Sequence, residues 1–128
     1  MNIQLAYRVT GEKIESLHIM LKKIKAILES NNHNLWIPEL DPKKPSVKKE
    51  LLNKTLNKIM DCDAILAIVK SEEKSEGMLL EIGYAIGKNK KVFLLIKENI
   101  KNTYLLEVSN KIITFKDEKD LYEKVKLI

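Results

Sequence analysis

A serine, a glycine and a glutamate in the segment "SEGMLLEIGYAIG", residues 75–87, are the side chains best placed to do chemistry. Ser75 and Gly77 stand at the predicted start of a helix, and Glu81 follows six residues after the serine. Serine is a good helix N-cap, and glycine lets a ligand approach the backbone closely. The free N–H groups and the dipole of a first helical turn favour an anion such as phosphate. A capped helix without a ligand would carry the same pair, so the spacing alone leaves both interpretations open.

Glu81 is unusual because it interrupts the apolar part of this helix. We expect an apolar stripe to face the rest of the fold, formed by Met78, Leu79, Ile82, Ala85 and Ile86. Glu81 borders that stripe on the side of Gly77 and Tyr84. Its carboxylate therefore either points into a crevice or is solvated at the surface, and the spacing permits both.

The elements that must position these residues alternate along the chain. Apolar segments predict strands at residues 2–9, 34–40, 63–70, 90–97 and 111–116. Amphipathic segments predict helices at residues 11–30, 46–62 with Ser46 as N-cap, 75–88, 117–128 and, in a short piece, within 98–110. Strands that alternate with helices indicate a parallel sheet covered on both faces. We expect one α/β domain over residues 1–128, a flavodoxin-like three-layer fold whose five strands run in the order 2-1-3-4-5.

Ligands in such folds bind beyond the carboxyl ends of the strands, at the switch point between strands one and three. Three groups of residues are expected there: Tyr7, Arg8 and Gly11 after the first strand, Glu39 and Asp41 after the second, and Ser75 and Gly77 after the third.

Composition narrows the classes of function. The net charge is +5, but lysines are spread over the chain and aromatic residues are few, so nucleic-acid binding is not expected. No apolar run reaches the roughly 18 residues of a membrane span, and the N-terminus does not resemble a secretory signal. The lone Cys62 fits a reducing compartment, so we expect a cytoplasmic protein. No residues have metal-ligand spacing, and no motif indicates a cofactor.

The segment "DAILAIV" followed by "SEGMLLEIGYAIGKNKKVFLLI" resembles the nucleoside 2-deoxyribosyltransferase superfamily, which includes deoxynucleoside monophosphate N-glycosidases. The matched positions are Asp63, Ser75, Gly77, Glu81, Gly83, Ala85 and Lys88, with Tyr84 also typical of the group.

The resemblance implies a role for each matched residue. Glu81 would be the nucleophile that attacks the anomeric carbon of the sugar, and Ser75 and Gly77 would hold a phosphate or a sugar hydroxyl. Tyr7 would line the pocket beside the sugar or base. The substrate would be a nucleoside or a nucleotide, and a homodimer or higher homo-oligomer is expected.

Thr55 departs from the family pattern, because it occupies the position of an aspartate that would protonate the leaving base. A threonine has no carboxyl proton to give. Glu39 or Asp41 could replace that acid from another element. The alternatives are a nucleotide-binding or sensing module without turnover, and a glycohydrolase of a larger nucleotide such as NAD.

Overall fold

Five parallel strands form the single sheet of the molecule, and the computed structural model describes all residues from 1 to 128. The strands are β1 (Asn2–Tyr7), β2 (Asn34–Trp36), β3 (Ala64–Val69), β4 (Lys91–Lys97) and β5 (Lys111–Phe115). Their order is β2-β1-β3-β4-β5, and each neighbouring pair is parallel. The predicted fold class and strand order are therefore confirmed.

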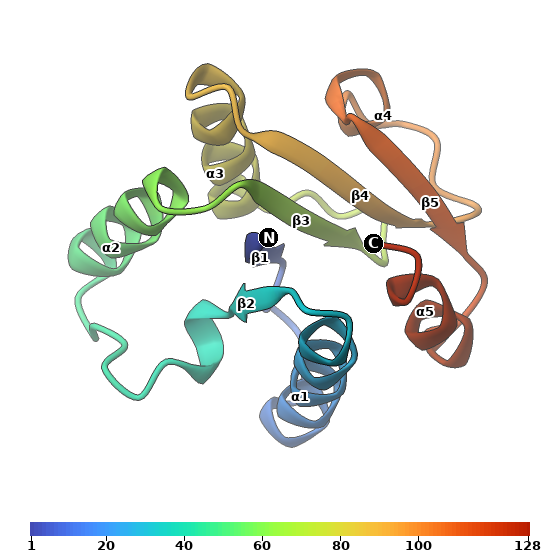
Figure 1. Ribbon diagram of the computed structural model, residues 1–128, viewed down its shortest axis with the longest axis horizontal. Helices are drawn as coiled ribbons and strands as arrows, with labels where there is room; N and C mark the ends of the chain where they lie inside the picture. The colour runs from blue at the N-terminus through green and yellow to red at the C-terminus, as the bar shows by residue number, and fades with distance from the viewer.

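Helices cover both faces of this sheet (Figure 1). They are α1 (Ile14–Ser30), α2 (Lys48–Met60), α3 (Glu76–Gly87), α4 (Leu105–Val108) and α5 (Glu118–Val125). In Figure 1, α1 and α5 lie on one side of the sheet, and α2, α3 and α4 lie on the other. This arrangement follows from parallel strands, because each return crossover needs a helix packed on one face or the other.

Two apolar cores result, one on each face. The first joins Leu21 and Ile24 of α1 and Leu121 of α5 to the sheet, and the second joins Ile82 of α3 and Ile59 of α2 to it. The residues of β3 alternate between the two cores, so that strand is buried on both faces, as its unbroken apolar sequence predicts.

The second strand differs from its prediction. The sequence predicts an extended segment over residues 34–40, but β2 ends at Trp36 and a single 3-10 turn, η1 (Pro38–Leu40), follows. Pro38 cannot donate a backbone hydrogen bond to a sheet, and its fixed φ suits the first position of a helical turn. The turn brings Glu39 onto a short helical segment beside the end of β1.

Two details of the helices also differ from expectation. The second helix starts at Lys48, so its N-cap residue is Val47 and not Ser46. Leu79 and Ile86 do not face the sheet, because both side chains are 41% exposed. The stripe that packs on the sheet is narrower and consists of Met78, Ile82 and Ala85.

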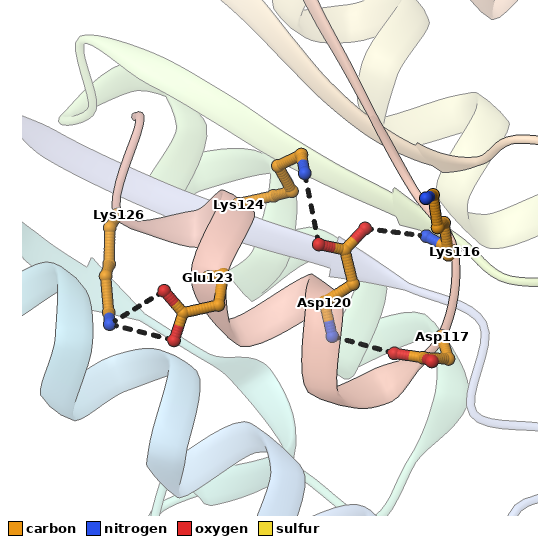
Figure 2. A network of polar contacts seen from close by, with 6 residues as sticks. All are labelled: Lys116, Asp117, Asp120, Glu123, Lys124 and Lys126. Atoms are coloured by element: carbon orange, nitrogen blue, oxygen red, sulfur yellow. Dashed lines mark hydrogen bonds and ion pairs between the residues drawn. The ribbon is translucent and has the colours of Figure 1, made fainter.

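The last helix is held by a local polar network (Figure 2). The Asp117 carboxylate caps α5 by accepting a hydrogen bond from the Asp120 backbone N–H at 2.8 Å. Asp120 accepts in turn from the Lys116 N–H at 2.9 Å and from the Lys124 ammonium at 3.0 Å. These bonds hold the pKa of Asp120 below its usual range.

No helix in the chain combines the length and the apolar character that crossing a membrane requires.

Candidate active site

A cavity of about 810 Å³ opens beyond the carboxyl end of β1. Its walls come from the end of β1, from η1, from the first turns of α2 and from the N-terminal half of α3. The lining residues are Leu5, Tyr7, Arg8, Thr10, Pro38, Glu39, Lys48, Lys49, Leu51, Leu52, Thr55, Lys74, Ser75, Glu76, Gly77, Leu80 and Glu81. This is the switch point of the strand order, where the sequence analysis predicts a ligand-binding site.

Most of the predicted site residues meet in this cavity. They are Tyr7, Arg8, Glu39, Ser75, Gly77 and Glu81, and Thr55 lies among them. Gly11 and Asp41 are not part of its lining. Gly11, with a positive φ of 85°, belongs to an adjoining cavity of about 470 Å³ that the loop 71–75 also lines. The two cavities share five lining residues: Tyr7, Arg8, Thr10, Lys74 and Ser75.

Glu81 projects from the second turn of α3 into the larger cavity and is half-buried. Burial, which is the larger effect, and the negative charge of Glu39 together raise the pKa of its carboxyl to about 7. Glu39 reaches the same cavity from η1, and burial also raises its pKa, against the opposing effects of a hydrogen bond from its own backbone N–H and of the charges of Lys44 and His18. Two carboxyl groups with raised pKa values in one cavity are typical of acid–base or nucleophilic chemistry.

The N-terminus of α3 forms the adjacent wall. The Ser75 hydroxyl caps the helix by accepting a hydrogen bond from the Met78 N–H at 3.2 Å, as the sequence predicts. A Cβ placed on Gly77 would meet no atom within 4 Å, so open space lies directly before this residue. The first backbone N–H groups of a helix have no intrahelical partner. An anion in the cavity can therefore reach these groups without steric hindrance.

The end of β1 contributes two polar side chains that are already engaged. The Tyr7 hydroxyl donates to the Glu12 carboxylate at 2.7 Å, and burial, the largest effect, together with this bond raises the Tyr7 pKa. The Arg8 guanidinium pairs with Glu73 of the loop 71–75 and donates to the Thr10 carbonyl at 2.9 Å. Arg8 thus ties the loop before α3 to the end of β1.

The two candidate replacement acids differ sharply in their surroundings. Asp41 forms an ion pair with Lys54 at 2.7 Å and accepts from the Lys43 N–H at 2.9 Å, and these contacts lower its pKa. Asp41 therefore stays ionised and links the end of η1 to α2, and it is a poor proton donor. Glu39 has no such partner. Thr55 is 2% exposed, and its hydroxyl donates to the Leu51 carbonyl at 2.8 Å within α2.

Three lysines at the cavity were not predicted as site residues. Lys48 and Lys49 come from the first turn of α2, and Lys74 from the loop before α3. The lysine-dense segment "DPKKPSVKKE" was a signal for the first two, but a solvated surface accounts equally well for such a run. No group of three or more His, Cys, Asp or Glu residues is arranged to hold a metal ion.

The family model for nucleoside 2-deoxyribosyltransferase matches residues 14–115. The chain belongs to the nucleoside 2-deoxyribosyltransferase family. The matched range includes η1, α2 and α3, and hence every wall of the cavity except the end of β1. No curated protein matches the chain.

Solved structures of similar fold agree with this family membership. The CMP N-glycosidase BcmB of Clostridium botulinum has a TM-score of 0.74 and 22% identity, with 99% of this chain and 98% of that chain covered. A 2-deoxyribosyltransferase of Bacillus psychrosaccharolyticus has a TM-score of 0.71 and 20% identity, covering 95% and 90%. A third, from Leishmania mexicana, has a TM-score of 0.65 and 21% identity, covering 76% and 65%. At these identities the likeness establishes the fold that nucleoside 2-deoxyribosyltransferases share.

Proposed function

We propose that the chain cleaves the bond between the base and the sugar of a nucleoside or nucleotide, with Glu81 as nucleophile. One observation carries the proposal. Glu81 is a half-buried carboxyl with a raised pKa on the wall of an 810 Å³ cavity, at the switch point of the sheet and beside the open N-terminus of α3. Family membership makes an N-glycosidic bond the expected target of such a carboxylate.

The chemistry requires a carboxylate at this place. Breaking an N-glycosidic bond leaves positive charge on the anomeric carbon, and a carboxylate beside that carbon either stabilises the charge or forms a covalent bond to it. In the proposed step, Glu81 bonds to the anomeric carbon while the electron pair of the broken C–N bond leaves with the base. Water then releases the sugar in hydrolysis, whereas a second base would receive it in a transfer reaction.

The charges on the cavity favour a nucleotide over an uncharged nucleoside. Arg8, Lys48, Lys49 and Lys74 all contribute to its lining, and the N-terminus of α3 adds unpaired N–H groups beside Ser75. A phosphate bound there would have both cationic side chains and helix N–H groups as partners. The CMP N-glycosidase from C. botulinum has this fold and acts, by its name, on a nucleoside monophosphate.

The direct test incubates the protein with ribo- and deoxyribonucleosides, their 5′-monophosphates and NAD, and measures free base by chromatography. We expect base release from at least one member, faster for a monophosphate than for its nucleoside. A second free base added to the reaction distinguishes transfer from hydrolysis, because only transfer yields a new nucleoside. Failure of every substrate to release base would contradict the proposal.

A second candidate function is a nucleotide-binding module without turnover. It is favoured by Thr55, whose hydroxyl is committed to the Leu51 carbonyl and which has no proton to give a leaving base. Calorimetric titration with the same compounds separates the two functions. Binding without base release would support the module, and release of base would reject it.

A further inference from the structure

The proposed cleavage needs an acid that the matched family position does not supply. A purine or pyrimidine is a poor leaving group unless it is protonated as it departs. Thr55 lies at the cavity but cannot donate a carboxyl proton. We propose that Glu39 is the catalytic acid that protonates the departing base, an inference that rests on the proposed function and adds a residue to it.

The topology places Glu39 opposite Glu81. The turn η1 follows β2, and α3 follows β3; these strands are the two neighbours of β1 in the sheet. The two carboxyl groups therefore reach the cavity from either side of the end of β1. Glu76 is the third carboxylate of the lining, but it lies at the first, exposed position of α3. Glu39 and Glu81 are therefore the two carboxyl groups of the lining that are half-buried.

Asp41, two residues further on, holds Glu39 in place. Its ion pair with Lys54 joins the end of η1 to α2, and the Lys54 ammonium also donates to the Lys43 carbonyl at 3.2 Å. The ammonium of Lys58 on α2 lies 5.5 Å from the ring centre of Trp36 in β2, which adds a second connection. The short turn is thus attached to α2 on both sides of Glu39.

Glu39 and Glu81 can together supply the proton and the negative charge that the reaction needs. Burial raises the pKa of both carboxyl groups, and the charge of Glu39 adds to the effect of burial on Glu81, whose pKa is about 7, so a proton is available to the pair near neutral pH. Without substrate this proton lies on Glu81 at pH values below about 7. Positive charge developing on the sugar beside Glu81 favours ionisation there, which leaves the shared proton for Glu39.

Other ionisable groups also face this pair. Lys44 and His18 act on Glu39 and lower its pKa, while Tyr7, Arg8, Lys48, Lys49, Lys74 and Glu76 line the same cavity. Lysine and arginine side chains do not ordinarily titrate near neutral pH. The pH dependence near neutrality is therefore assigned to the pair of carboxyl groups.

The cleavage conserves atoms and charge. The carboxylate of Glu81 bonds to the anomeric carbon, the C–N bond breaks, and its electron pair goes to the base nitrogen. The carboxyl proton of Glu39 passes to the base, which leaves neutral. A water then attacks the anomeric carbon and gives a proton to the Glu39 carboxylate, and the bond to Glu81 breaks. Both carboxyl groups return to their initial states, and one water is consumed for each base released.

The test uses Glu39→Gln, which keeps the shape of the side chain and removes its proton. On the monophosphate that the wild type cleaves best, we expect kcat to fall by roughly 10²- to 10⁴-fold. The fall of activity with rising pH above about 7 should vanish in this variant and persist in Glu39→Asp. Glu50→Gln is the matched control, since Glu50 is an exposed glutamate of α2 outside the cavity, and it should behave like the wild type.

A readout independent of turnover is the titration of Glu81 in the unliganded protein, followed by NMR. Without the charge of residue 39, the pKa of Glu81 should fall below its wild-type value of about 7. Wild-type turnover by Glu39→Gln, with Glu81→Gln inactive, would overturn the inference and leave the proposed function intact. Absence of base release by the wild type would overturn both.

Discussion

The Glu81 side chain lowers the stability of the folded protein more at high pH than at low pH. Its pKa is about 7 in the fold, against an ordinary value of 4.5, so the folded protein binds this proton more tightly than the unfolded chain. The free energy of unfolding should therefore decrease as the pH rises from about 4.5 to about 7. Groups that chemistry requires are often accommodated at such a loss of stability.

Glu81→Gln should accordingly stabilise the protein at pH 8 and have little effect at pH 4. We expect a gain on the order of 2–3 kcal/mol at pH 8, where the wild-type carboxyl must ionise in its buried position. Urea unfolding of both proteins at the two pH values measures it. An equal difference in stability at pH 4 and pH 8 would show that Glu81 does not titrate with a raised pKa.

For single residues, the sequence predicts which side chains lie at the site better than it predicts which contacts they make. Ser75, Gly77 and Glu81 could be placed together because one helix carries them at fixed spacing. Glu39 and Asp41 could not be told apart, since both follow the second strand. Only the position of Lys54 decides between them, and that contact depends on how η1 packs against α2.

The N-terminus of α3 is the proposed anion-binding end of the site, and two glycines of this helix test that role. At both Gly77 and Gly83 an added Cβ would meet no atom within 4 Å, and neither residue has a positive φ. Alanine at either position should therefore stabilise the helix by roughly 0.5–1 kcal/mol.

Their effects on ligand binding should differ. Gly77 lines the cavity and Gly83 does not, so Gly77→Ala should weaken binding of a nucleotide several-fold while Gly83→Ala leaves it unchanged. Thermal unfolding and calorimetry on the same samples measure both effects. Equal affinities for the two variants would place the ligand away from the N-terminus of α3.

The N-cap residues of α3 and α5 allow a second comparison, between a cap at the cavity and a cap outside it. Ser75→Ala and Asp117→Ala each remove a side chain that accepts a backbone N–H, so each should cost about 1 kcal/mol of stability. Asp117 belongs to the network of Figure 2 and is not part of the cavity lining. Only Ser75→Ala should raise KM for a monophosphate. A similar rise in both variants would attribute the effect to lost stability and not to a lost contact.

Element boundaries show where prediction from the sequence fails. The long helices and the buried strands β3 and β4 have strong periodic or unbroken apolar patterns, and they form where expected, although the N-cap of α2 is Val47 and not Ser46. The segment 34–40 is apolar enough for a strand, but Pro38 changes its last residues into a 3-10 turn. That change bears on the proposed catalytic acid, because Glu39 lies on this turn.

The whole molecule leaves one apolar surface of α3 uncovered. Leu79, Leu80 and Ile86 are 41%, 51% and 41% exposed, and Leu80 also lines the cavity. The sequence predicts an amphipathic helix that buries two of these residues, and the sheet does not accommodate them. Family resemblance predicts a homodimer or larger assembly, which would cover such a surface.

This prediction is checked by measuring the mass in solution. We expect at least twice the 14.8 kDa of one chain at micromolar concentration, and we expect Ile86→Lys to lower it. Ile86 is outside the cavity lining, so this variant tests assembly without changing the site. A mass of 14.8 kDa for the wild type at every concentration would contradict the prediction of an oligomer.

The rates of base release by the wild type and by Glu81→Gln test most directly whether Glu81 breaks the base–sugar bond. The comparison uses the best monophosphate substrate at saturation, with the folded fraction of each protein checked by circular dichroism. We predict that Glu81→Gln releases base roughly 10³-fold more slowly or not at all. Release of base by Glu81→Gln at the wild-type rate would contradict the role of Glu81 as nucleophile.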